Sequence, residues 1–139
     1  MREILFRAKR EDNGEWVYGY YVRLPDVAGS VNMMHIPARN PDECNATFYI
    51  DPKTLGQFTG LTDKNGTRIF EGDIVRHYCK LPVPGGEIGT VRGTIKWDSE
   101  ECFFFRTSLD GKDKTISAKC EYEIIGNIYD NPELIGGEK

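Results

Sequence analysis

Hydrophobic positions alternate with polar ones over short stretches of this chain, and turn-forming residues separate the stretches. Side chains of an extended strand point alternately to its two faces, so the residues of 16–24 divide into an even-numbered and an odd-numbered face. The even-numbered face holds Trp16, Tyr18, Tyr20, Val22 and Leu24, and the odd-numbered face holds Val17, Gly19, Tyr21 and Arg23. With the alternation at 4–8 and the Asn13-Gly14 turn between them, this pattern predicts an N-terminal β-hairpin.

The segment 25–47 is expected to be an irregular loop. Four residues that interrupt regular structure fall within it, namely Pro25, Gly29, Pro37 and Pro41. One short strand is expected inside the segment, at 31–36, and another after it, at 48–50. Asp51 then precedes Pro52, a pair typical of a helix start, because aspartate caps exposed amides and proline has no N–H to leave unpaired there.

The second half of the chain shows the same pattern of short alternating stretches separated by turn-forming residues. Asn65-Gly66 is a strong turn signal, because both residues tolerate the positive φ of tight hairpins. Further strands are expected at 74–79, 90–97, 102–106 and 121–129, with a proline- and glycine-rich surface loop at 81–86. Asn131 before Pro132 repeats the capping pattern and predicts a terminal helical turn.

These elements predict a mainly β protein with only short helical turns. Residues 1–67 are expected to form a β-rich region, a hairpin or small sheet that contains the irregular loop 25–47. Residues 68–139 hold four or five short strands with glycines at their ends, which favours a small barrel of SH3-like type. A length of 139 residues fits one compact unit in which the N-terminal sheet packs on this barrel.

The charge is uneven along the chain. Residues 1–70 carry nine basic and nine acidic side chains, whereas 71–139 carry nine basic and 13 acidic, which accounts for the whole net charge of −4. Nucleic-acid binding depends largely on neutralising phosphates, so this balance disfavours nucleic acid as the partner. No apolar run is long enough for a membrane helix, and Arg7 interrupts the N-terminal apolar stretch too early for a signal peptide, so a cytoplasmic protein is expected.

The four cysteines do not form a typical metal site. They lie at 44, 79, 102 and 120, without the close pair that zinc sites usually contain. His77 and Cys79 would share one face of a strand and are the one combination that could hold a metal. Free cysteines that behave as small buried hydrophobes are the favoured interpretation, and no metal or cofactor is expected.

The chain contains no recognisable catalytic constellation. His35 and His77 are its only histidines, no serine lies in a G-x-S-x-G context, and no glycine-rich phosphate loop is present. Glu100 and Glu101 are adjacent in a turn, so their carboxylates diverge. We therefore expect a protein that is not an enzyme.

Three segments together resemble one family. The N-terminal Arg2-Glu3-Ile4-Leu5-Phe6-Arg7-Ala8 runs into Tyr18-Gly19-Tyr20, the middle segment spans 50–66 and 69–75, and the last spans 122–134. In this order and spacing the chain resembles the YopX family of phage and prophage proteins. The resemblance implies a phage or prophage origin, a mainly β fold and a place in the cytoplasm of the bacterial host. It implies no established activity and no catalytic motif.

Most residues of these segments have a structural interpretation. Gly66 and Gly72 lie where turns need a residue without Cβ, and the carboxylates around Gly72 are expected to accept backbone N–H bonds. Asn127 stands between Gly126 and Ile128 in an apolar strand, so its amide is either hydrogen-bonded inside the protein or exposed at a site. The hydrogen-bonded interpretation is favoured.

The aromatic residues favour a binding function. One cluster lies on the first hairpin, and a second holds Trp97, Phe103, Phe104 and Phe105. Phe104 points away from its two neighbours, so one face of this strand is expected to meet the N-terminal sheet, another subunit or a partner. The expected function is a non-catalytic, partner-binding or self-associating phage accessory protein. The alternative is a nucleic-acid-binding module, and the candidate surface for either is Lys96, Trp97, Phe104 and Arg106.

Overall fold

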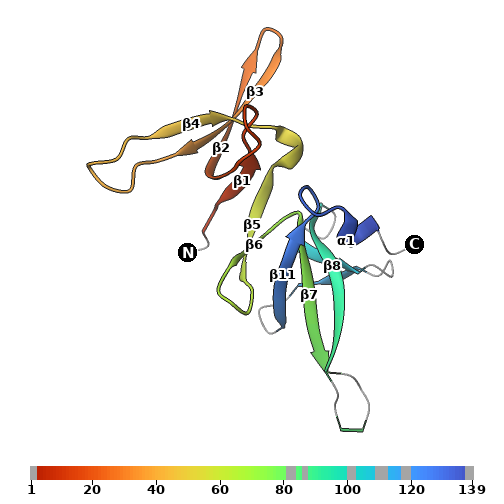
Figure 1. Ribbon diagram of the computed structural model, residues 1–139. Coiled ribbons are helices and arrows are strands. Elements are labelled where there is room, and N and C mark those ends of the chain that lie inside the picture. Colours follow the sequence, from red (N-terminus) through yellow and green to blue (C-terminus); the bar gives the residue numbers. More distant parts are fainter. Residues whose placement is uncertain are drawn as a thin grey trace. The chain divides into compact units, whose positions relative to one another are not determined.

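The computed structural model describes residues 3–80, 84–85, 88–99, 103–108, 113–116 and 120–136 (Figure 1). It is mainly β, as predicted, and its chain divides into two compact units, Met1–Phe58 and Thr59–Lys139. The sequence predicts a boundary after residue 67; the structure divides the chain earlier, within the strand Gly56–Thr62. In the described part of the chain, no helix is long and apolar enough to span a membrane.

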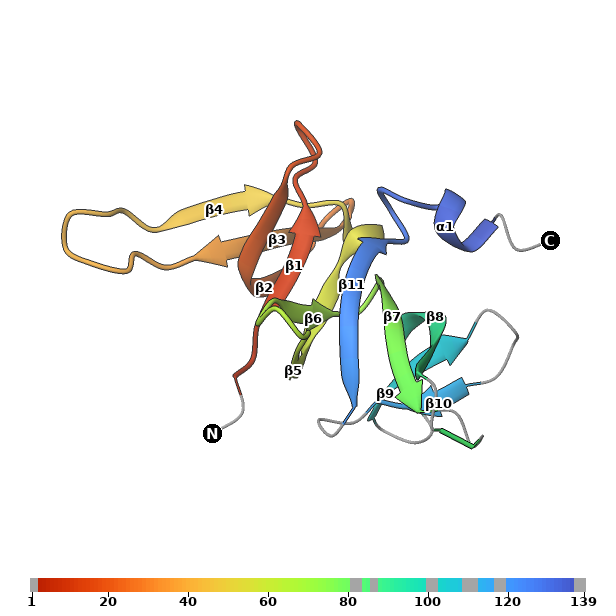
Figure 2. The same cartoon turned by 60° about the horizontal axis from the view of Figure 1, so that its bottom comes forward.

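Unit 1 is an antiparallel sheet with the strand order β4-β3-β2-β1-β5. Its elements are β1 (Phe6–Lys9), β2 (Trp16–Asp26), β3 (Gly29–Ile36), β4 (Ala46–Tyr49), the 3-10 turn η1 (Pro52–Thr54) and the start of β5 (Gly56–Thr62). Asp51 caps η1 as predicted, because its carboxylate accepts the Lys53 N–H at 3.0 Å and proline follows it. In Figures 1 and 2, β3 and β4 form a long hairpin that extends beyond β1.

The predicted irregular segment 25–47 contains a full strand. β3 pairs with β2 from Asp26↔Gly29 to Tyr20↔His35, so the expected strand at 31–36 begins two residues earlier. The interrupting residues are tolerated because Pro25 lies close to the hairpin end, and Gly29 turns the chain with φ +137°. Pro37 and Pro41 fall in the connection after β3, where the prediction of a loop is confirmed.

The core of unit 1 lies on one face of this sheet. Ala8, Met34 and Ile50 are fully buried, and Phe6, Val17, Tyr21 and Leu55 pack against them. The chain after β4 returns to β1 through an Arg10↔Ile50 bridge. Two backbone bonds reinforce the bridge: the Glu11 N–H donates to the Tyr49 carbonyl, and the Asp51 N–H donates to the Lys9 carbonyl, both at 2.9 Å.

Unit 2 contains a five-stranded antiparallel sheet with the order β10-β9-β8-β7-β11 (Figure 2). Its strands are β7 (Asp73–Lys80), β8 (Ile88–Asp98), β9 (Phe103–Ser108), β10 (Asp113–Thr115) and β11 (Glu121–Asn127), preceded by β6 (Arg68–Phe70), which follows β5, and followed by α1 (Glu133–Gly136). The core is formed by Ile69, Val75, Ile95 and Tyr122. Among the described strands, β10 and β11 lie at the two edges of this sheet and do not pair with each other. The sheet therefore does not close there, and the SH3-like barrel remains a prediction.

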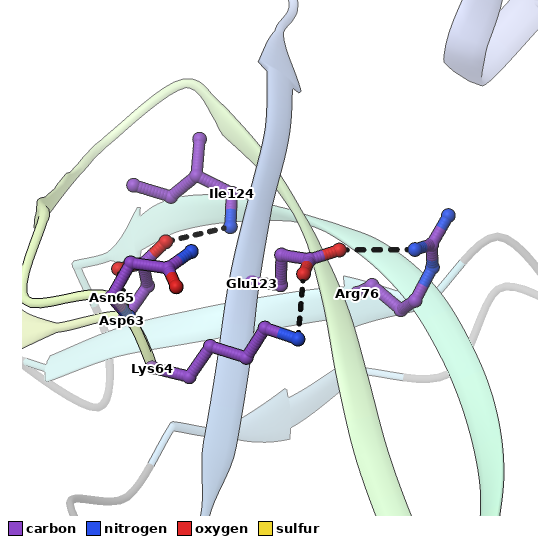
Figure 3. A network of polar contacts seen from close by, with 6 residues as sticks. All are labelled: Asp63, Lys64, Asn65, Arg76, Glu123 and Ile124. Carbon is purple, nitrogen blue, oxygen red and sulfur yellow. Dashed lines mark hydrogen bonds and ion pairs between the residues drawn. The ribbon is translucent and has the colours of Figure 1, made fainter.

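A buried carboxylate holds the turn after β5 against β11. Asp63 Oδ1 accepts the backbone N–H groups of Asn65 and Thr67, both at 2.9 Å, and Oδ2 accepts the Ile124 N–H at 3.2 Å. Gly66 has φ +83°, which confirms the predicted Asn65-Gly66 turn. The carboxylate therefore joins segments 61 residues apart (Figure 3).

An ion-pair network lies beside this carboxylate. Glu123 on β11 contacts Lys64 through Oε2 at 2.8 Å and Arg76 through Oε1 at 3.0 Å. Figure 3 shows the Glu123 carboxylate between the two cations. Because all three side chains are partly exposed, this network is expected to add about 1 kcal/mol or less to stability. The buried Asp63 hydrogen bonds are the stronger link between the turn and β11.

Candidate functional site

The outward face of the unit 1 sheet carries a group of apolar and aromatic side chains, which we call the tyrosine face. It consists of Tyr18, Tyr20, Val22 and Leu24 of β2, Val31, Met33 and His35 of β3, and Thr47 and Tyr49 of β4. The register places them in rows, Tyr20↔His35↔Thr47 and Val22↔Met33↔Tyr49, with Leu24↔Val31 beyond. A 3.3 Å contact between His35 Nδ1 and Thr47 Oγ1 confirms that one row lies on a single face.

The large side chains of the tyrosine face are exposed. The relative exposure is 47% for Tyr18, 52% for Tyr20, 49% for Leu24 and 62% for Tyr49. The opposite face of the same strands contributes Val17, Tyr21 and Met34 to the core. One face of the unit 1 sheet thus packs on the core, and the other is exposed and aromatic. In an antiparallel sheet, the face in contact with solvent ordinarily carries polar residues, so the exposed aromatic side chains are unusual.

Two cations border the tyrosine face at β1. The Arg7 guanidinium carbon lies 4.7 Å from the centre of the Trp16 ring, and the Lys9 ammonium lies 5.4 Å from it. These distances are in the range of cation–π contacts. The register pairs Lys9 with Trp16 and Arg7 with Tyr18, so the cations continue the rows of the tyrosine face toward β1.

Two hollows meet at Tyr49. The larger, of about 890 Å³, is lined mainly by the ends of β1 and β3 and by 49–52; its charged lining residues are Lys9, Arg10, Glu11 and Asp51. The smaller, of about 530 Å³, is lined by Arg10, Glu11, Asp12, Thr47, Phe48 and Tyr49. Both are open clefts at the edge of the sheet, and they share Arg10, Glu11 and Tyr49.

Arg10 is held in place between these hollows. Its guanidinium donates to both carboxylate oxygens of Asp12, from Nε at 2.9 Å and from Nη2 at 2.6 Å, and lies 4.3 Å from the centre of the Phe48 ring. The hydrogen bonds from Arg10 hold the pKa of Asp12 below its ordinary value of 3.8. As pH falls, the Asp12 carboxylate is therefore protonated, and the pair lost, at a lower pH than an aspartate with the ordinary pKa would require.

Replacing Arg10 with glutamine is expected to raise the pKa of Asp12 toward 3.8, because the main cause of its depression is removed. Carbon-detected NMR titration of the Asp12 carboxyl measures this directly. Lys9→Gln is the matched control, since it removes a neighbouring cation that does not bond Asp12. An Asp12 pKa unchanged in Arg10→Gln would contradict the assignment.

The register places three residues of the sequence-predicted surface, Trp97, Phe104 and Arg106, at positions of one parity and Lys96 at the other. β8 and β9 pair Trp97 with Phe104 and Ile95 with Arg106, whereas Lys96 pairs with Phe105 at the alternate register position. Lys96 is exposed and Trp97 is 43% exposed. The side chains of Phe103, Phe104, Phe105 and Arg106 lie outside the described residues, so the surface proposed there remains a prediction.

The described residues contain no group of three or more metal-ligating side chains. The His77 ring packs on Tyr122 with ring centres 5.0 Å apart, and the side chain of Cys79 lies outside the described residues. Cys44 and Cys120 are free but exposed, so the expectation of buried cysteines is wrong for these two; both lie outside the strands, where no core covers them.

The turn residues of the predicted motifs have structural roles. The buried Asp73 carboxylate accepts the Phe70 N–H at 2.8 Å, as expected for the turn at Gly72. Asn127 is half-buried, and its Oδ1 accepts the N–H groups of Tyr129 and Asp130. The predicted hydrogen bonding of Asn127 is therefore confirmed, whereas its expected full burial is not, and neither residue belongs to the exposed aromatic surface.

Sequence reasoning located half of the tyrosine face. It placed Tyr18, Tyr20, Val22 and Leu24 together, but it assigned the candidate surface to the second half of the chain. The residues of β3 and β4 were missed because strands were expected at 31–36 and 48–50 without their pairing beside β2 being predicted. The alternation of Val31, Met33 and His35 was the signal that could have found them.

Comparison with known proteins places the chain in a family. The crystal structure of protein EF1440 from Enterococcus faecalis resembles it with a TM-score of 0.54 and 23% identity, covering 97% of this chain and 99% of that one. At this identity the likeness shows the fold alone. No curated protein matches the chain. The family model of the YopX protein matches residues 5–136, nearly the full length, and the chain belongs to the YopX family.

Proposed function

We propose that this protein is a phage- or prophage-encoded accessory protein of the bacterial host cytoplasm that acts without catalysis and self-associates through the tyrosine face. The observation that carries the proposal is the exposure of Tyr18, Tyr20 and Tyr49 on one sheet face whose opposite side holds the core. Tyrosine supplies a large apolar ring and a polar tip, and it is enriched where protein surfaces meet.

The composition of the tyrosine face suits a protein interface. It contains no Asp, Glu, Lys or Arg, and depletion of charge is typical of the core of an interface. Covering its exposed apolar area would contribute about 25 cal/mol for each Å² removed from water. Val22, Met33 and Val31 lie between the exposed residues and extend the apolar area across three strands.

The local charge of this face permits a second copy as the partner. Each chain carries a net charge of −4, so two copies repel overall, and this repulsion is smallest when they meet through a surface without carboxylates. The paired positions on this face, from Lys9↔Trp16 to Leu24↔Val31, contain no carboxylate. A symmetric contact through this face therefore brings no carboxylates of the two copies directly against each other.

Single-stranded nucleic acid is the second candidate. Arg7 and Lys9 lie against Trp16 beside Tyr18, and an array of aromatic rings with adjacent cations is typical of surfaces that stack bases and follow phosphates. The acidic chain opposes this function, since binding would depend on these few cations.

Light scattering on a sizing column tests both candidates. The intact chain is run at low and at high salt, with and without a mixed-sequence single-stranded oligonucleotide. Self-association predicts a discrete oligomer whose mass is unchanged by salt or oligonucleotide, because apolar burial holds it together. A monomer that shifts with the oligonucleotide at low salt would overturn this proposal in favour of nucleic acid. A monomer under every condition would contradict both.

A further inference from the structure

The free edge of β4 presents backbone groups to solvent. The Tyr49 carbonyl accepts the Glu11 N–H, whereas the Ile50 N–H donates to Asn32 of β3. In an extended strand, backbone polar groups of successive residues point to opposite sides. Thr47 therefore aims its N–H and C=O away from β3, on the same side as those of Tyr49. β4 ends the order of its sheet, and within the described chain no strand pairs with this edge at Thr47.

The hollow of about 530 Å³ lies along this edge. One wall is Thr47–Tyr49 and the other is Arg10–Asp12, at the start of the turn between β1 and β2. The two walls are joined at the Glu11–Tyr49 hydrogen bond. Because the Glu11 N–H already occupies the Tyr49 carbonyl, an incoming extended chain would pair with this edge at Thr47.

The charge of the hollow favours a ligand with basic side chains. Arg10 is ion-paired with Asp12 at 2.6 Å, and its guanidinium covers the Phe48 ring. Glu11 contributes a further, exposed carboxylate, so the lining carries one positive and two negative charges. A basic side chain on the incoming segment would complement this excess.

We propose that the β4 edge binds an extended peptide segment of a partner protein that carries basic side chains. Its backbone pairs with Thr47, in the manner of strand addition to a sheet edge, and a basic side chain lies near Glu11. This site goes beyond the proposed self-association, because it uses the backbone of the β4 edge, whereas self-association uses the side chains of the tyrosine face, Thr47 and Tyr49 among them. Variants at Tyr18 and Tyr20, which do not line the hollow, distinguish the failure of one proposal from the failure of the other.

The test measures binding of capped, fluorescein-labelled peptides to the intact chain by fluorescence anisotropy. The probe is Thr-Lys-Val-Lys-Val-Thr, and its matched control is Thr-Glu-Val-Glu-Val-Thr. The basic peptide is expected to bind saturably, at least about tenfold tighter than the acidic one. Glu11→Gln is expected to remove most of this preference. Absence of saturable binding, or equal binding of both peptides, would overturn the proposal.

A backbone variant tests the pairing itself. Thr47→Pro removes the outward N–H, whereas the bonds to β3 through Phe48 are retained, and proline is tolerated in an edge strand. It is expected to abolish peptide binding, whereas Thr47→Val, which keeps the N–H, binds as the wild type does. Wild-type affinity in Thr47→Pro would refute strand addition.

Two further measurements separate the possible outcomes. If Thr47→Pro does not fold, hydrogen exchange of the wild-type backbone amides tests the pairing instead. The basic peptide is expected to slow exchange of the Thr47 N–H. Exchange of this group that the peptide leaves unchanged would refute the proposal. A Tyr18→Ser/Tyr20→Ser variant is expected to keep full peptide affinity. Loss of affinity in that variant would place the peptide on the tyrosine face and overturn the assignment to the edge.

Discussion

Replacing Asp63 with alanine is expected to lower the free energy of unfolding of unit 2 by about 3–5 kcal/mol, because three backbone N–H groups lose their acceptor at once. Asp63 is only 7% exposed, so water replaces the carboxylate poorly. The measurement is chemical denaturation followed by the fluorescence of Trp97 in a Trp16→Phe background. These are the only two tryptophans, and they lie in different units.

Two variants control this experiment. Asp63→Asn keeps Oδ1 for Asn65 and Thr67 but turns an amide toward the Ile124 N–H, so we expect an intermediate loss of about 1–2 kcal/mol. Glu121→Ala removes an exposed carboxylate from unit 2 and is expected to change stability by less than about 0.5 kcal/mol. A loss in Asp63→Ala no larger than that in Glu121→Ala would contradict the role of the Asp63 carboxylate.

Substituting Gly19 with alanine is expected to destabilise unit 1 by about 2–3 kcal/mol. A Cβ at Gly19 would overlap the His35 carbonyl oxygen and would lie 3.1 Å from the carbonyl carbon. Both contacts are to backbone, so no rotamer change relieves them, and β2 must separate from β3. Where a glycine has ordinary φ and free space, alanine usually stabilises a protein instead, so the expected sign is specific to this contact.

The measurement is denaturation followed by Trp16 fluorescence in a Trp97→Phe background. Gly14→Ala is the control within unit 1: its φ of +72° disfavours alanine, but nothing lies within 4 Å of the added Cβ. The strained backbone there is expected to cost about 1 kcal/mol. If Gly19→Ala were no more destabilising than Gly14→Ala, the close approach of β2 to His35 would be wrong.

Local patterns predicted the features that depend on near neighbours in sequence. The alternation over 16–24 sorted the residues of β2 into its two faces, and the Asp51-Pro52 pair identified η1. In each case the deciding interaction lies within a few residues. The tyrosines of β2 could therefore be grouped correctly before the structure was known.

Features that depend on distant segments could not be predicted in this way. The pattern around Asp63 shows a turn, but the bond to Ile124 depends on how β11 lies against that turn. In the sequence, Gly19 is only one more glycine in a strand, because its contact with His35 depends on how β2 pairs with the strand expected at 31–36, and that pairing was not predicted. The choice of the exposed aromatic face likewise requires knowing which side of β3 and β4 packs on the core, and only register settles that.

The central claim is that the tyrosine face associates with a second copy. Sedimentation equilibrium of the wild type, Tyr18→Ser/Tyr20→Ser and Trp97→Ser tests it most directly, because these substitutions remove exposed aromatic side chains from different units. Buried tyrosines at an interface each contribute about 1–2 kcal/mol or more, so the double variant is expected to raise the dissociation constant by about a hundredfold. Trp97→Ser is expected to leave it unchanged. A double variant that associates as tightly as the wild type, or dissociation caused by Trp97→Ser alone, would contradict the claim.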